Sequence, residues 1–121
     1  MRTVISLSIC LFLLSCASAK PGPAAFTSAE KAILAAERAG AEELAPTELR
    51  FAREKLEAAR QGMAQRKYAV AMYLVEESEI NSELAIEQSR AAQSRRRVNE
   101  LQRSNEMLRE ELQTTYGESF E

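Results

Sequence analysis

The longest stretch without a helix breaker constrains this sequence most. No glycine or proline lies between Gly62 and Gly117, and these two residue types destabilise a helix interior most strongly. Alanine, glutamate, arginine and leucine are abundant there, and all four favour helix. The sequence therefore predicts one helix of about fifty residues that begins near Arg66, roughly 75 Å long at 1.5 Å per residue. Thr114 and Thr115 are its first stop signals.

Two shorter helices are expected before the long one. Residues 28–39 follow a capping-box pattern, Thr27 with Glu30, and Gly40 is a plausible stop. Pro46 suits the first turn of a second helix over 47–63, because its missing N–H would have no partner there, and Gly62 marks its end. The apolar stripe of this second helix steps by three and four residues through Leu49, Ala52, Leu56, Ala59 and Met63.

These three helices predict an all-α fold, an antiparallel three-helix bundle or helical hairpin. The short helices can cover only the first half of the long one, so its C-terminal part extends as a possible short coiled coil. Tyr68 and Tyr73 are expected to pack at the turn before the long helix. The first half of that helix offers a partner face of mostly small residues: Tyr68, Ala71, Met72, Val75, Ser78, Ser82 and Ala85.

The C-terminal half of the long helix carries a separate heptad pattern. Its a and d positions are Val98, Leu101, Asn105, Leu108 and Leu112, which we call the arm stripe. An asparagine at an a position favours a parallel two-stranded register. Two interpretations stay open: a stripe for self-association or a partner helix, or a solvated single helix held by pairs such as Arg96 with Glu100.

The N-terminus has the form of a secretion signal. Residues 4–14, VISLSICLFLL, are an apolar run too short to span a membrane. LLSC at 13–16 resembles the bacterial lipobox, which implies cleavage between Ser15 and Cys16 and a diacylglycerol and palmitate anchor on Cys16. The alternative is ordinary cleavage after Ala19, which would release a soluble secreted protein. No aspartate follows Cys16, which by the lipoprotein sorting rule implies the outer membrane.

The predicted organisation has four parts. Residues 1–15 are the signal peptide, 16–26 the lipidated cysteine and a flexible tether, 27–95 the helical domain, and 96–121 a C-terminal arm and tail. Pro21 and Pro23 on either side of Gly22 favour an extended tether.

Several function classes are disfavoured. The chain has no histidine or aspartate, and both cysteines lie at the signal segment, so we expect no metal site, no cofactor and no enzyme activity. Sixteen basic against 18 acidic side chains give no general attraction to nucleic acid. Neither a nucleic-acid partner nor a small-molecule substrate is expected. Arg95, Arg96 and Arg97 are interpreted as a solvated face, and the alternative is contact with the phosphates of anionic lipid or polysaccharide.

APTEL (45–49), AREKLEAA (52–59) and YAVA (68–71) resemble the small alanine-rich bacterial lipoproteins grouped as domain of unknown function 4398. The resemblance covers about residues 25 to 95. It implies a helical hairpin or bundle on a lipid anchor at the cell envelope, sometimes joined to peptidoglycan-binding domains of the OmpA type, and it supplies no activity.

The expected function is a scaffold or adaptor for envelope proteins such as an OmpA-type protein, anchored to the outer membrane and facing the periplasm. A second hypothesis is a spacer between membrane and cell wall. This spacer is similar to the murein lipoprotein but has only non-covalent wall contacts.

Overall fold

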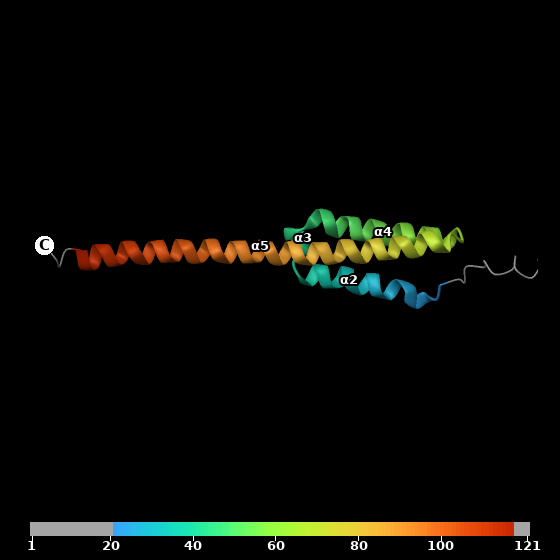
Figure 1. Ribbon diagram of the computed structural model, residues 1–121, viewed down its shortest axis with the longest axis horizontal. Coiled ribbons are helices and arrows are strands. Elements are labelled where there is room, and N and C mark those ends of the chain that lie inside the picture. The colour runs from blue at the N-terminus through green and yellow to red at the C-terminus, as the bar shows by residue number, and fades with distance from the viewer. Residues whose placement is uncertain (1–20, 118–121) are drawn as a thin grey trace, which may run out of the picture.

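The computed structural model describes residues 21–117, and the regular structure within this range is helical. α4 runs antiparallel to both α2 and α5, and α5 continues far beyond the other helices (Figure 1). The predicted all-α bundle with a long C-terminal helix is therefore confirmed. The elements are η1, a 3-10 turn (Pro23–Phe26), α2 (Thr27–Arg38), α3 (Ala41–Leu44), α4 (Pro46–Ala64) and α5 (Tyr68–Tyr116).

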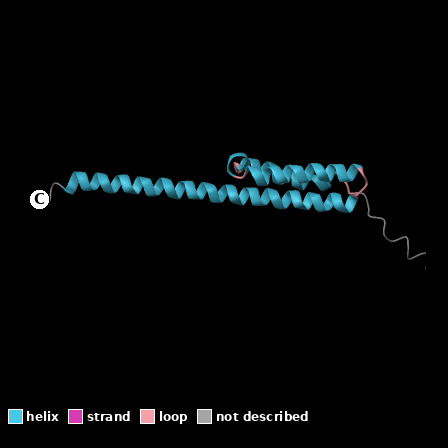
Figure 2. Cartoon of the chain, turned by 90° about the horizontal axis from the view of Figure 1, so that it is seen from above, coloured by secondary structure: helices cyan, strands magenta, loops and turns pink. Residues whose placement is uncertain are grey.

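α5 is the central element of the bundle. It contacts η1, α2, α3 and α4, and both α2 and α4 lie on one side of it (Figure 2). The buried face of α5 is Ala71, Val75, Ser78, Ser82, Ala85 and Ser89, which we call the inner stripe. Five of these residues were predicted, and Ser89 extends the predicted face by one turn.

Small side chains allow a close approach of α4 and α5. A Cβ placed on Gly62 would lie 3.3 Å from the Cβ of Ala71, so the α4 stripe ends in the buried Gly62. The prediction that Met63 closes this stripe was wrong, because Met63 is only half-buried. Gly62 also does not end the helix, which continues to Ala64.

The turn between α4 and α5 is a Schellman motif without glycine. Lys67 N–H donates to the Gly62 carbonyl at 2.9 Å and Arg66 N–H to the Met63 carbonyl at 3.0 Å. Arg66 has a φ of 60°, the left-handed conformation that this motif requires. α5 therefore begins at Tyr68, two residues later than predicted.

Two details at the N-terminal end correct the prediction. Residues 23–26, expected in the extended tether, form η1, and Phe26 packs against the cluster around Leu56 and Val75. The Thr27 N–H donates to the Ala24 carbonyl, and Thr27 has helical φ and ψ. Because an N-cap residue needs a non-helical backbone, Thr27 cannot form the predicted capping box, and no side chain caps α2.

Gly40 ends α2 as predicted. Its φ is 79°, a left-handed conformation in which a side chain is strained. The chain then makes the short α3 and re-enters helix at Pro46. This turn places Ala41 and Ala45 in a buried cluster with Leu49 and Ala85.

The buried serines of α5 all have hydrogen-bond partners. Ser78 donates across the helix interface to the Ala52 carbonyl of α4 at 2.8 Å. Ser82 and Ser89 donate to carbonyls of their own helix, at 2.8 and 2.7 Å. In residues 21–117, every buried side-chain nitrogen or oxygen has a partner, so small polar residues can occupy the interface without an unpaired group.

Candidate functional site: the outer surface of α5

The predicted processing residues, Ser15 and Cys16, lie outside the described residues. The predicted arm stripe lies within them. Val98, Leu101, Leu108 and Leu112 are between 51% and 57% exposed, and Asn105 is exposed as well.

The arm stripe is brought to one face by its spacing alone. Steps of three and four residues return to the same side of a helix of 3.6 residues per turn. The stretch from Arg95 to Tyr116 is exposed at every residue, so no other described element covers it. Figure 1 shows α5 leaving the bundle as a single helix.

A polar cluster holds the base of the arm. The Gln93 side chain donates from Nε2 to the Ala39 carbonyl at 3.0 Å, and Arg96 forms an ion pair with Glu43 of α3 at 2.8 Å. These contacts fix α5 against the α2–α3 turn at the point where it leaves the bundle. Arg96 thus pairs across helices, and not with Glu100 as the solvated-helix interpretation supposed. No local sequence pattern indicates this ion pair, because Glu43 and Arg96 are far apart in the chain.

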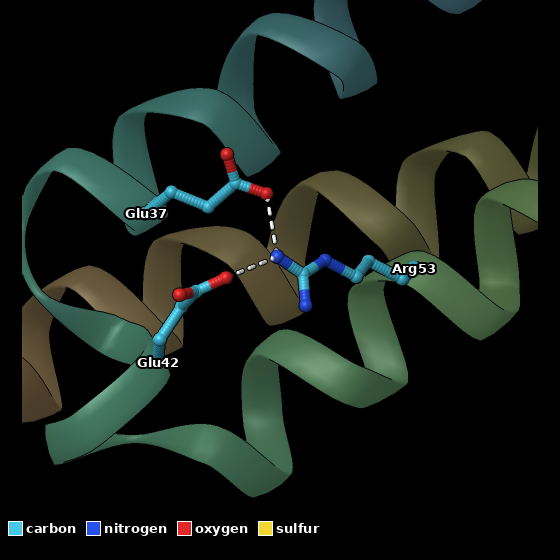
Figure 3. A network of polar contacts seen from close by, with 3 residues as sticks. All are labelled: Glu37, Glu42 and Arg53. Carbon is cyan, nitrogen blue, oxygen red and sulfur yellow. Dashed lines mark hydrogen bonds and ion pairs between the residues drawn. The ribbon is translucent and has the colours of Figure 1, made fainter.

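A second polar cluster lies at the same end of the bundle. Arg53 of α4 donates to Glu37 of α2 at 2.6 Å and to Glu42 of α3 at 2.9 Å (Figure 3). The two hydrogen bonds raise the pKa of Arg53 above its usual value, and the bond to Glu37 has the larger effect. The guanidinium is charged at any physiological pH, and its two hydrogen bonds tie the turn between α2 and α3 to α4.

Further ion pairs link the helices along the bundle. Arg60 of α4 pairs with Glu30 of α2 at 2.8 Å, and Lys55 of α4 pairs with Glu77 of α5 at 3.5 Å. Arg60 and Glu30 are about half exposed, so their pair contributes little stability by itself, whereas Lys55 and Glu77 are partly buried. Their effect is to set which surfaces of the three helices face one another.

Tyr73 corrects one sequence prediction and enlarges the candidate site. Tyr68 is half-buried at the turn, as expected, but Tyr73 is 58% exposed. It lines an open pocket together with Ala25 of η1 and Ser28 of α2. Three further apolar residues of the bundle part of α5, Val70, Ile80 and Leu84, are also about half exposed.

The surface beside the arm stripe is open and carries both apolar and polar side chains. Open grooves run beside the arm stripe, one at Ser94, Arg95, Val98 and Asn99 and another at Leu108, Glu111, Leu112, Thr115 and Tyr116. Between residues 21 and 117, no three carboxylates or other ligating side chains group as a metal would require. In the same range, no helix combines the length and the apolar character of a membrane span.

Comparison with known proteins bears on the folded part of the chain. Residues 24–101 match the family described as Domain of unknown function (DUF4398). The match runs from η1 to the first turns of the arm, so it includes the whole bundle and leaves most of the arm outside. Comparison with curated proteins and with solved structures finds no match. Because the family match covers more than half of the sequence, this chain belongs to the DUF4398 family.

Proposed function

We propose that this protein is an outer-membrane lipoprotein that faces the periplasm and acts as a helical scaffold for envelope proteins. The observation that carries the proposal is the arm, a continuation of α5 beyond the bundle with a row of exposed apolar side chains. The contacts of α5 with the other helices end at Arg96. A row of exposed apolar side chains beyond that point is typical of a surface on which another helix packs.

The arrangement of the two ends fits an anchored scaffold. η1 contacts α5, and Phe26 and Leu74 pack against the same buried cluster, so the start of the described fold and the N-terminal part of α5 lie at the same end. α5 then extends over roughly 70 Å at 1.5 Å per residue, away from that end (Figure 1). A lipid on Cys16 would hold the bundle at the membrane and direct the arm into the periplasm.

Recognition by the arm would be of the helix-in-groove kind. Leu101, Leu108 and Leu112 are apolar anchors at successive steps of seven and four residues, which place them on one face of the helix, as in amphipathic partner helices. An envelope protein of the OmpA type is one candidate partner. The polar base at Gln93 and Arg96 would keep the arm at a fixed angle to the bundle.

Labelling with palmitate tests the anchor. The variant Cys16→Ala should lose the label and leave the membrane fraction, because the thioether carries the diacylglycerol. Cys10→Ala is the matched control, since it removes the other cysteine of the same segment and should keep the label. Equal labelling of Cys16→Ala and the parent chain would contradict the proposal in favour of cleavage after Ala19.

Truncation tests the scaffold role. A chain that stops after Glu100 keeps the Arg96–Glu43 pair and the whole bundle, so it should stay anchored and folded. We expect it to lose the envelope proteins that the full chain captures. Recovery of the same partners by both chains would show that the arm is not the docking element.

A membrane-to-wall spacer is the second candidate function, and the length of α5 is the observation that favours it. A spacer needs many copies, because each one supports only a small area between the membrane and the cell wall. Quantitative proteomics of the envelope should therefore find it among the most abundant envelope proteins. An adaptor is expected to be scarce.

A further inference from the structure

The exposed apolar side chains of α5 follow one heptad register along its whole length. α5 has ten exposed large hydrophobic residues, and eight of them fall on the a and d positions that the arm stripe defines. Four of the eight define the register. Of the six other residues, four fall on it, where two positions in seven would hold about two by chance. The eight, which we call the outer stripe, are Val70, Tyr73, Ile80, Leu84, Val98, Leu101, Leu108 and Leu112.

The outer stripe lies opposite the inner stripe. Each register position of the outer stripe follows one of the inner stripe by two residues, as Tyr73 follows Ala71 and Ile80 follows Ser78. Two residues correspond to a rotation of about 200° on an α-helix. Because both stripes repeat every seven residues, they stay on opposite faces throughout. α2 and α4 pack against the side of α5 that carries the inner stripe, where Leu74 and Ile86 of α5 are partly buried as well.

The arm cannot extend the existing bundle. If the register of the inner stripe is continued beyond Ser89 and Ala92, it reaches polar side chains at every position. A helix that packed there would bury charges without partners. The apolar surface of the arm is therefore continuous with the outer face of the bundle. The polar positions are Arg96, Asn99, Arg103, Glu106, Glu110 and Gln113.

We propose that the outer stripe is the seam of a parallel homodimer, in which α5 of a second copy packs along the whole of α5. The orientation rests on the proposed function, since two chains anchored at their N-termini enter the pair from the same side. In this pair the second copy takes the place on the arm stripe that the proposed function gives to a partner helix. In parallel register, Asn105 meets Asn105 of the second copy, the polar pair that specifies two strands.

The polar positions of the register are compatible with this pairing. Glu77 is held toward Lys55 of α4 at 3.5 Å, and Glu87 toward Arg90 at 2.6 Å, so neither carboxylate has to lie in the seam. Ala91 and Ser94 are small and let the two helices approach closely.

The apolar area is sufficient for a stable dimer. The eight side chains are between 47% and 58% exposed. If each presents roughly 80 Å², two copies would bury on the order of 1,300 Å², which is within the range of stable specific interfaces.

Cysteine cross-linking in the full chain tests the seam. Leu84→Cys, Val98→Cys and Leu108→Cys are made one at a time, and membranes that hold each variant are oxidised. In a parallel dimer every seam position meets itself, so each variant should give a disulfide-linked product of twice the parent mass. The parent chain, which keeps Cys10 and Cys16, supplies the background.

Arg103→Cys is the matched control, because Arg103 is exposed on the opposite face of the same arm. It should give no more dimer than the parent. Equal dimer from Arg103→Cys would overturn the seam, as would the absence of dimer from all three seam variants. Dimer at only one seam position would indicate antiparallel pairing and contradict the proposal.

Two further outcomes would overturn it. Dimer at 98 and 108 without dimer at 84 would restrict pairing to the arm. A disulfide product with a different mass would show that another protein occupies the stripe. Since palmitate labelling of Cys16 does not depend on pairing, failure of the seam and failure of the anchor are distinguished.

Discussion

Replacement of Leu49 by alanine should destabilise the bundle more than most single truncations in this chain. Leu49 is 1% exposed and is one of the few large side chains in a core made mostly of alanine and serine. It packs among Ala36, Ala41, Ala45 and Ala85. The alanines have no side-chain freedom with which to fill the space that the leucine leaves, so any collapse has to come from Ile33 and Ile86, which pack against this cluster.

The size of the effect follows from two contributions. Removal of three carbon groups at about 0.8 kcal/mol each loses roughly 2.4 kcal/mol of transfer free energy. A residual cavity of about 40 Å³ adds on the order of 1 kcal/mol. The free energy of unfolding should therefore fall by about 3–4 kcal/mol, from a total of about 5–15 kcal/mol for a chain of this size.

Urea unfolding followed by circular dichroism, at one protein concentration, measures this loss. Leu34→Ala is the matched control, because Leu34 is 44% exposed on α2, and it should lose less than about 1 kcal/mol. A loss below about 1 kcal/mol for Leu49→Ala would refute the reasoning, because the site would then be able to collapse or Leu49 would not be buried.

The remaining predictions concern two turns and one buried hydrogen bond. Gly40→Ala should cost about 1 kcal/mol in urea unfolding, since Gly40 has a φ of 79°. Arg66→Gly should raise the free energy of unfolding by about 0.5 kcal/mol, because Arg66 has a φ of 60°, which glycine adopts without strain. A change of stability in the same direction for both variants would contradict the turn assignments. Ser78→Ala should lower the free energy of unfolding by about 1 kcal/mol, because it removes the 2.8 Å hydrogen bond to the Ala52 carbonyl. Ser78→Leu should lower it more, because the larger side chain overpacks the helix interface. A Ser78→Leu variant as stable as the parent would show that α4 and α5 are not closely packed.

Much of the fold follows from local sequence signals. The absence of glycine and proline between Gly62 and Gly117 predicts α5, and Gly40 and Pro46 mark the turn between α2 and α4. The stripe of α4 predicts its buried face because a step of three or four residues is a property of the helix itself. Such signals can be interpreted without knowledge of the tertiary contacts.

The errors arise where a distant contact decides the local structure. Gly62 was interpreted as a helix end, but it is buried because Ala71 approaches it. Arg66 carries no turn signal, yet it adopts the left-handed conformation that joins α4 to α5. Thr27 has the pattern of a cap, but η1 continues into α2 and supplies the carbonyl that its N–H needs.

The candidate site was predictable only in part. The arm stripe is visible in the sequence because it is a heptad of apolar residues in an otherwise polar segment. The same register in the bundle part, at Val70, Ile80 and Leu84, is hidden because the residues of the inner stripe alternate with it along the sequence. Only the burial of the inner stripe separates the two patterns and shows that the outer one is uncovered.

The central claim is that a lipid on Cys16 fixes this helical protein to the envelope. Mass spectrometry of the N-terminal peptide of the native protein tests it directly. We predict that the mature chain begins at Cys16 and carries a diacylglyceryl group and an amide-linked acyl chain. A mature chain that begins with an unmodified Lys20 would contradict the claim.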